Sequence, residues 1–348
     1  MNKTTDRSVS NELKMAPFEL NIWLGCFILI TGNISTFGNI IIFSSRAFRN
    51  RACTVYLLVE AIVLIFFFDL VLLTRTLQKG FRIPVLNRYD AICRLRYFAS
   101  QYTNLIAISL FILATTDRYL STQRSQALRK WSGRTSLAYK LVLACVIIWF
   151  VFGCHRLVLY SAATGYCIAQ PGLYALLDNY LEAVISGLCP PVIIFVLSYL
   201  LMRSVRNTIQ RQNLVLSNEP NKPAVNSTFL RKTDKQLTQM LFWQTLVAIP
   251  AFIPYTIQLI YSNVTENWSK SPEWVAWENV CVETIRLLSY TFFSTRLYIT
   301  LISSRRLRRE IFRIFRLRNG IQPTDVTLNT IDQTTAGGLI TIKQQTNT

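Results

Sequence analysis

The chain has 348 residues, of which 51% are hydrophobic and only 16% are charged. Soluble domains carry about 25% charged residues, so the composition argues against an ordinary soluble protein. The net charge of +19 would suit nucleic acid. Most of the chain, however, lies in apolar blocks of membrane-spanning length, and nucleic acid is therefore not an expected partner.

Seven apolar blocks follow one another along the chain, and each supplies the roughly 20 residues that a membrane-spanning helix needs. They cover residues 18–45, 54–75, 91–117, 136–160, 177–203, 234–262 and 276–303. The third and seventh blocks contain more polar residues, as expected of helices that face the interior of a bundle. The pattern predicts an all-α membrane protein in which residues 18–303 form a bundle of seven transmembrane helices.

Two segments follow the last block. In residues 304–318, apolar side chains recur at i, i+4, i+7 and i+8 while arginines fill the other face. This spacing predicts a short amphipathic helix that lies on membrane lipids. Residues 319–348 contain eight threonines and no aromatic residue, so a disordered tail is expected there.

Lysine and arginine are distributed unequally between the two sets of connecting segments. With the N-terminus placed outside, the inner segments carry 22 of these residues and the outer segments carry 9. This excess is the positive-inside signature, and it places the C-terminus in the cytoplasm. We expect a multi-pass plasma-membrane protein with residues 1–17 outside the cell. Three sequons for glycosylation, at Asn2, Asn263 and Asn267, lie in the outer segments.

The eight cysteines and the single histidine limit the chemistry of the chain. Only Cys93 and Cys167 fall in outer positions where they are able to pair, and most of the others lie in or near apolar blocks. His155 has no second histidine or carboxylate cluster beside it, so no metal site is expected. Nucleophile motifs and phosphate-binding loops are also missing, and we expect neither an enzyme nor a bound cofactor.

One predicted helix carries Cys93 near one end and the triplet Asp117-Arg118-Tyr119 near the other. Twenty-five residues separate the cysteine from the arginine. That is about 37 Å along an α-helix, roughly one bilayer with its interfaces. The spacing resembles the third helix of a rhodopsin-like (class A) G-protein-coupled receptor. The resemblance implies a disulfide between Cys93 and Cys167 that holds the second outer loop over a ligand pocket.

The resemblance also implies a switch at the inner face. Arg118 is expected to pair with Asp117 and, across the bundle, with Asp234, which lies twenty residues before Pro254 in the sixth block. Breaking the link to Asp234 would let the sixth helix swing outward. For Asp234 the alternative is a solvated charge in an Arg-Lys-Thr-Asp-Lys run.

Further residues match the rhodopsin-like pattern in order along the chain. They are Asn39 of the Gly38-Asn39 pair in helix one, Trp149 in helix four, Pro191 and Tyr199 in helix five, Phe252 and Pro254 in helix six, and Tyr298 in helix seven. The prolines are expected to kink their helices and so provide hinges. In the family, the tyrosines of helices five and seven face inward and meet through water on activation.

Four positions depart from the family pattern. Leu64 occupies the place where the family usually keeps a sodium-binding aspartate, and Ser294-Thr295 replaces the Asn-Pro pair of helix seven. Arg296 is an unusual cation for a membrane interior and needs a partner, for which Glu60 is a candidate. These departures predict weak or absent sodium modulation, and they leave open that the receptor has lost coupling.

Polar residues gather toward the outer ends of the helices. Ser100, Gln101 and Asn104 give helix three an uncharged polar lining, at a level where amine receptors keep an aspartate. Tyr255 and Gln258 follow the proline of helix six and are expected to face the same pocket. An amine ligand is therefore not expected.

Four carboxylates near the outer ends of helices five and seven would add an acidic rim to this pocket. They belong to Asp178, Glu182, Glu278 and Glu283. Such a rim suits a basic, amidated peptide. The alternative for each carboxylate is that it faces water or a neighbouring side chain.

The resemblance covers residues 18–318 and implies a receptor that binds an extracellular ligand and activates a heterotrimeric G protein. Thr54-x-Tyr56-Leu57-Leu58 and Tyr166-Cys167 with Pro171-Gly172 are similar to invertebrate neuropeptide receptors of the FMRFamide-receptor-like kind, so a neuropeptide is expected. Phosphorylation of tail threonines by a receptor kinase would then recruit arrestin. The alternatives are a noncoupling orphan receptor or, less favoured because no internal repeat is found, a transporter or channel.

Overall fold

The computed structural model describes residues 10–45, 51–123, 125–163, 165–218, 225–265, 267–303 and 308, and only the backbone of residues 208–237. Nearly all of these residues are helical, apart from short connections and one hairpin of two strands. The amphipathic helix expected over 304–318 and the tail expected over 319–348 lie outside the described residues, except for Arg308.

The elements alternate between long helices and short connections. They are α1 (Asn11–Phe43), α2 (Ala52–Phe66), the π-helix η1 (Phe67–Leu72), α3 (Leu73–Lys79), α4 (Val85–Arg88), α5 (Asp90–Ser121), α6 (Gln126–Trp131), α7 (Thr135–Gly153), α8 (His155–Leu159), β1 (Tyr160–Ser161), β2 (Ile168–Ala169), α9 (Leu173–Leu181), the π-helix η2 (Glu182–Leu188), α10 (Cys189–Asn218), α11 (Val225–Val264), α12 (Pro272–Ser294) and α13 (Arg296–Ser303). The helix α1 begins seven residues before the first predicted block. Ser10 caps this earlier start by accepting a hydrogen bond from the Leu13 N–H.

Six helical stretches in the described part of the chain are long and apolar enough to cross a membrane. They cover residues 11–43, 52–79, 90–121, 135–159, 173–207 and 238–264. Such a series indicates a helical, multi-pass membrane protein. The predicted seventh span corresponds to α12 and α13, which do not belong to these six. Among the residues of α12 are Glu273, Glu278, Glu283 and Arg286, and these lower its apolar character.

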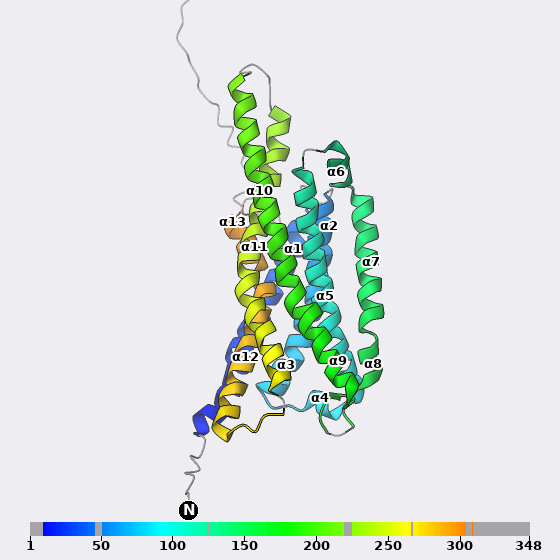
Figure 1. Ribbon diagram of the computed structural model, residues 1–348, viewed down its shortest axis with the longest axis vertical. Helices are drawn as coiled ribbons and strands as arrows, with labels where there is room; N and C mark the ends of the chain where they lie inside the picture. Colours follow the sequence, from blue (N-terminus) through cyan, green and yellow to red (C-terminus); the bar gives the residue numbers. More distant parts are fainter. Residues whose placement is uncertain are drawn as a thin grey trace, which may run out of the picture.

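The helices run side by side as a bundle (Figure 1). In the bundle α5 packs against α2, α7 and α10, while α12 packs against α1 and α11. We call the end that holds α4, α8, α9 and the hairpin the disulfide end, and the end that holds α6 the arginine end. The chain passes between the two ends with each long helix in turn, so residues near the ends of different helices come together.

Large apolar side chains cover the outer surface of the bundle. Trp23 of α1 is 78% exposed and Val151 of α7 is 66% exposed. Water would make such a surface costly, whereas a bilayer matches it. Inside the bundle, close approach depends on small residues of α1. A Cβ atom at Gly32 would lie 2.5 Å from the Phe68 ring, and one at Gly38 would lie 2.5 Å from Leu297.

Candidate functional site

A disulfide between Cys93 and Cys167 joins the first turn of α5 to the β1–β2 hairpin, as the resemblance implied. Their Cα atoms are 5.7 Å apart, a normal separation for a disulfide. Tyr160 of β1 and Leu86 of α4 pack around the bond in a small apolar cluster. The hairpin is thereby held at the entrance to the interior of the bundle.

A buried arginine that the sequence analysis did not single out organises the same end. Arg156 of α8 is 2% exposed, and its guanidinium pairs with Asp178 of α9 at 3.0 Å and with Glu182 of η2 at 2.9 Å. The Tyr160 hydroxyl donates a second hydrogen bond to Asp178, over 2.7 Å. Burial raises the pKa of Tyr160 above its usual value, so this hydroxyl stays protonated as a donor. Two of the four predicted acidic-rim residues are therefore engaged within the protein.

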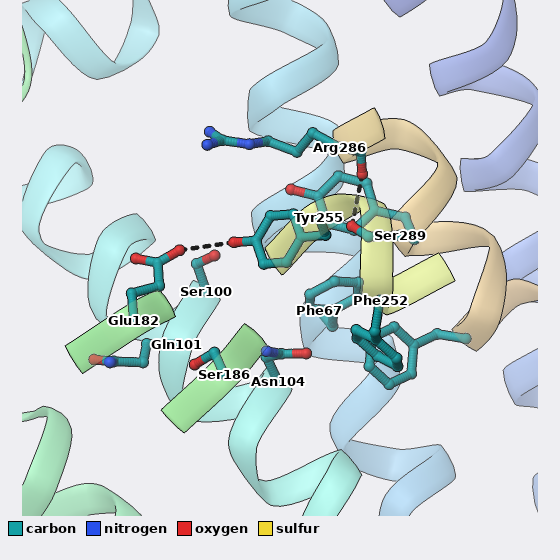
Figure 2. Close-up of a pocket in the computed structure, with 12 residues that line it drawn as sticks. Phe67, Ser100, Gln101, Asn104, Glu182, Ser186, Phe252, Tyr255, Arg286 and Ser289 are labelled. Atoms are coloured by element: carbon teal, nitrogen blue, oxygen red, sulfur yellow. Dashed lines mark hydrogen bonds between the residues drawn. The ribbon is translucent and has the colours of Figure 1, made fainter. Parts of the chain in front are cut away.

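Behind the disulfide lies a cavity of about 450 Å³, counting its open side. Ser100, Gln101 and Asn104 of α5 and Tyr255 of α11 line it, as predicted (Figure 2). Glu182 of η2 also lines it, and its second carboxylate oxygen accepts a hydrogen bond of 2.8 Å from the Tyr255 hydroxyl. The lining thus combines amides, hydroxyls and a carboxylate that is already bound on both oxygens.

Gln258 and Glu283, which were also expected to face the ligand, are not among the lining residues. Gln258 donates from its amide to Ser262 on its own helix. Glu283 forms an ion pair with Arg75 of α3 and accepts a 3.0 Å hydrogen bond from Asn21 of α1. Its carboxylate holds α1, α3 and α12 together, and Glu283 does not line this cavity.

Aromatic rings form the floor of the cavity. Phe67 of η1 and Phe293 of α12 lie with their ring centres 5.1 Å apart. Phe252 of α11, the predicted toggle residue, is 2% exposed and lies 5.1 Å from the Phe292 ring. Pro254 follows it within the same helix. A ligand in the cavity would therefore lie directly against the segment of α11 that contains the proline.

An ion pair lies deep in the bundle, just beyond this floor. Glu60 of α2 is 1% exposed, Arg296 of α13 is 3% exposed, and their side chains pair. The guanidinium also stands over the Phe111, Phe292 and Phe293 rings, at 4.8, 4.7 and 5.6 Å from their centres. The partner that the sequence analysis considered for Arg296 is thus the one it has.

A second, smaller cavity adjoins this ion pair. Asn39, Leu64 and Gln244 line it together with Glu60 and Arg296. Asn39 is 5% exposed, and its side-chain oxygen has no hydrogen-bond partner among the described residues. Leu64 contributes an apolar wall where the family pattern predicts an aspartate.

At the arginine end, Asp117 and Arg118 of α5 pair side by side, with 2.5 Å between Nη2 and Oδ2. Both are largely buried, at 7% and 4% exposure. The other Asp117 oxygen accepts from the Gly133 N–H at 3.0 Å and from the Ser132 hydroxyl at 3.2 Å. Asp117 thus anchors Arg118 to the connection between α6 and α7, while Tyr119 beside it is half-buried. The side chain of Asp234, the predicted partner on α11, lies outside the described residues.

The two tyrosines expected to meet across the interior are placed differently. Tyr199 of α10 is 61% exposed and faces away from the bundle, because the inward positions are those of Ser198 and Leu201. Tyr298 of α13 reaches α1, where its hydroxyl donates to the Thr31 carbonyl at 3.4 Å. The inward orientation predicted for Tyr199 was therefore wrong.

Two residues predicted to be structural lie inside the bundle. The indole N–H of Trp149 donates to the Ser109 hydroxyl at 2.9 Å, which joins α7 to α5. Pro191 is buried near the start of α10, directly after η2. The π-helix widens the turn before the proline, so the distortion of this helix extends over more residues than a simple proline kink.

The predicted glycosylation sites differ in access. Asn267 and Ser269 are exposed in the connection between α11 and α12. Asn263 lies in the last turn of α11 with its amide nitrogen buried, and Thr265 of the same sequon is 2% exposed. Asn2 lies outside the described residues. Asn267 is therefore the better acceptor of the two that are described.

The remaining polar chemistry is structural. His155 shares a 2.8 Å hydrogen bond with the Tyr174 hydroxyl. No group of three or more His, Cys, Asp or Glu side chains suited to a metal ion occurs among the described residues. The chain matches no protein-family model, and no curated protein matches it in sequence. Its function is therefore inferred from its own residues.

Proposed function

We propose that the chain is a rhodopsin-like G-protein-coupled receptor of the plasma membrane. It binds an extracellular peptide at the disulfide end and activates a heterotrimeric G protein at the arginine end. The observation that carries this proposal is α5, a single helix that begins with a disulfide to a hairpin and ends with the buried Asp117–Arg118 pair. A receptor needs such a helix, because it must connect an outer ligand site with an inner effector site.

The proposed orientation places the disulfide end outside the cell. It is supported by the excess of lysine and arginine in the segments assigned to the cytoplasm. The disulfide supports the same orientation, since such bonds persist in oxidising compartments. In this proposal α12 and α13 form the seventh span. Ion pairs of Glu283 with Arg75 and of Arg296 with Glu60 reduce the cost of placing charges there.

Signal transfer in the proposed receptor runs through α11. A ligand in the cavity presses on the aromatic floor at Phe252, and Pro254 allows α11 to bend there. Outward movement of the inner part of α11 then uncovers Arg118 for the G protein. Threonines of residues 319–348 serve a receptor kinase and arrestin, and the arginines of 304–318 contact anionic lipids.

The proposal is tested in cells that carry exchange sensors for several G-protein families. The cells receive a library of short synthetic peptides, half with a C-terminal carboxylate and half with a C-terminal amide. We expect at least one peptide to trigger nucleotide exchange, and Arg118→Ala to abolish that response at equal surface expression. Arg129→Ala removes an exposed arginine of α6 at the same end and should leave the response intact. Exchange that survives Arg118→Ala would overturn the proposed role of α5.

A noncoupling receptor is the second candidate, and two observations favour it. Tyr199 faces outward, and the buried pair of Glu60 and Arg296 ties α2 to α13 two residues before Tyr298. In this case peptides bind to the purified chain, yet no G-protein family exchanges nucleotide.

A further inference from the structure

The four carboxylates of the predicted acidic rim are already engaged by cations of the protein. Their partners are Arg156 for Asp178 and Glu182, Arg75 for Glu283, and Lys270 for Glu278. Glu182, the one among them that lines the cavity, also accepts the Tyr255 hydroxyl. A basic ligand would therefore find no unpaired carboxylate among these four.

Arg286 is the cationic side chain of the cavity lining. It extends from α12 over the cavity, above the hydrogen bond between Glu182 and Tyr255 in the view of Figure 2. Its guanidinium makes no hydrogen bond or ion pair with any residue that the structure describes, and its Nε atom is buried. The residue as a whole is half-buried, and a guanidinium that is partly removed from water without a directly bonded partner is costly. This arginine is therefore suited to an anion from outside the chain.

Neighbouring arginines add to the positive potential at this level. Arg96 of α5 is 7% exposed, lies one turn before Ser100, and makes no ion pair with a described residue. Arg75 lies near both Arg96 and Arg286 and is itself held by the Glu283 carboxylate. Tyr255, Tyr290, Glu182 and Glu283 lie near Arg286, but the carboxylate oxygens of Glu182 and Glu283 are held by other donors.

Neutral groups in the same lining also lack partners. Both polar atoms of the Gln101 amide and the Ser186 hydroxyl are buried without a hydrogen bond to any described residue. These two side chains are 4% and 2% exposed. Such groups are normally satisfied, so they indicate a polar ligand or ordered water in the cavity. An amide that offers both a donor and an acceptor matches the backbone of a peptide.

We infer that the cavity binds a carboxylate, and that Arg286 holds it through the two parallel hydrogen bonds that a guanidinium makes to a carboxylate. The ligand class is a peptide with a free C-terminal carboxylate, whose last amide contacts Gln101. The space inside the cavity that is open to water-sized groups is only about 40 Å³, which suits the terminal carboxylate group rather than the whole peptide. This inference rests on the proposed receptor function and replaces the expectation of a basic, amidated ligand.

The test measures binding without a G protein, so that its failure differs from a failure of coupling. The purified full chain in lipid nanodiscs is incubated with two pools of synthetic tetrapeptides, identical except for a C-terminal carboxylate or amide. Bound peptides are recovered and quantified by mass spectrometry. A third pool of small monocarboxylic and dicarboxylic acids without an amide separates a peptide terminus from a free organic acid as the source of the carboxylate.

We expect retention from the carboxylate pool to exceed that from the amide pool at least tenfold. Arg286→Gln should reduce it at least tenfold, and Arg286→Lys, which keeps the charge, should restore part of it. Arg88→Gln is the matched control, since it removes an exposed arginine of α4 at the same end. Retention of the small acids alone would support carboxylate binding and assign a free acid as ligand.

Equal retention of acids and amides, or no retention from any pool, would overturn the inference. Undiminished retention by a folded Arg286→Gln chain would do so as well. Monodispersity and thermal denaturation of each variant establish that it is folded. If amidated peptides trigger nucleotide exchange and both pools are retained equally, the inferred carboxylate site is wrong while the proposed receptor function stands. Selective retention of acids without exchange would leave it standing and count against coupling.

Discussion

Removing one partner of the Glu60–Arg296 pair is expected to destabilise the bundle by about 3–5 kcal/mol, because the other charge is then left buried. Glu60 is 1% and Arg296 is 3% exposed, so neither reaches solvent without rearrangement. The two single changes should differ. Glu60→Gln leaves the guanidinium over its three phenylalanine rings, and each such contact contributes about 0.5–2 kcal/mol. Its cost should therefore lie near 3 kcal/mol.

Arg296→Gln also removes the contacts with the rings, and its cost should lie near 5 kcal/mol on the same scale. The double change Glu60→Leu with Arg296→Met replaces both charges by apolar groups of similar volume. Buried pairs replaced in this way are often neutral or more stable by about 1–4 kcal/mol. The double variant should therefore be at least as stable as either single variant, although it carries more changes.

The assay is thermal denaturation of purified chains in nanodiscs, followed by tryptophan fluorescence. At about 2 °C per kcal/mol, the single variants should lower Tm by roughly 6–10 °C. Arg94→Gln is the control, because Arg94 and Asp90 form an exposed pair whose worth is about 0–1 kcal/mol. The reasoning is refuted if the single variants lose no more than the control. It is refuted equally if the double variant loses the sum of the single losses.

Three further predictions follow from other contacts. Tyr160 is buried and donates to Asp178, and its burial raises its pKa above that in the unfolded chain. Its contribution to the free energy of unfolding is therefore complete below about pH 10 and is lost as the pH rises further. Tyr160→Phe should therefore flatten the fall in Tm between pH 9 and 11, and an unchanged slope would contradict this. Asn267→Gln should remove a glycan and so increase the mobility of the protein on gels, whereas Asn263→Gln should leave the mobility unchanged, because the Asn263 amide is buried. The reverse pattern would contradict the assigned exposure. Trp149→Phe should cost about 1 kcal/mol through the lost hydrogen bond to α5, and a Tm equal to wild type would show that this bond contributes nothing.

The positions of the long helices follow from the sequence, because apolar length is a property of consecutive residues. Each of the six membrane-length helices overlaps a predicted block. The resemblance implied the pairing of Cys93 with Cys167, and the structure has this disulfide where α5 and the hairpin meet. The chain therefore encodes its spans and its disulfide in features that are readable without coordinates.

The direction in which an individual side chain points, into the bundle or away from it, does not follow from its position in the sequence. Tyr199 is next to the inward-facing Ser198, and one residue along an α-helix is a rotation of about 100°. The π-helices η1 and η2 add to this difficulty, because an extra residue in a turn changes the facing of everything beyond it. Their positions depend on tertiary packing, which periodicity alone does not reveal.

The partner of each charge was likewise decided by the tertiary structure. Glu283 was expected at the ligand and is held by Arg75, while Arg286, which had no expected role in the pocket, lines the cavity. An ion pair forms between side chains that are adjacent in space, and Glu283 of α12 meets its partner on α3, far away in the sequence. Sequence alone thus determined that the chain is a membrane bundle with polar residues at one end. Only the packed helices decided which of those residues are satisfied within the protein and which remain for a ligand.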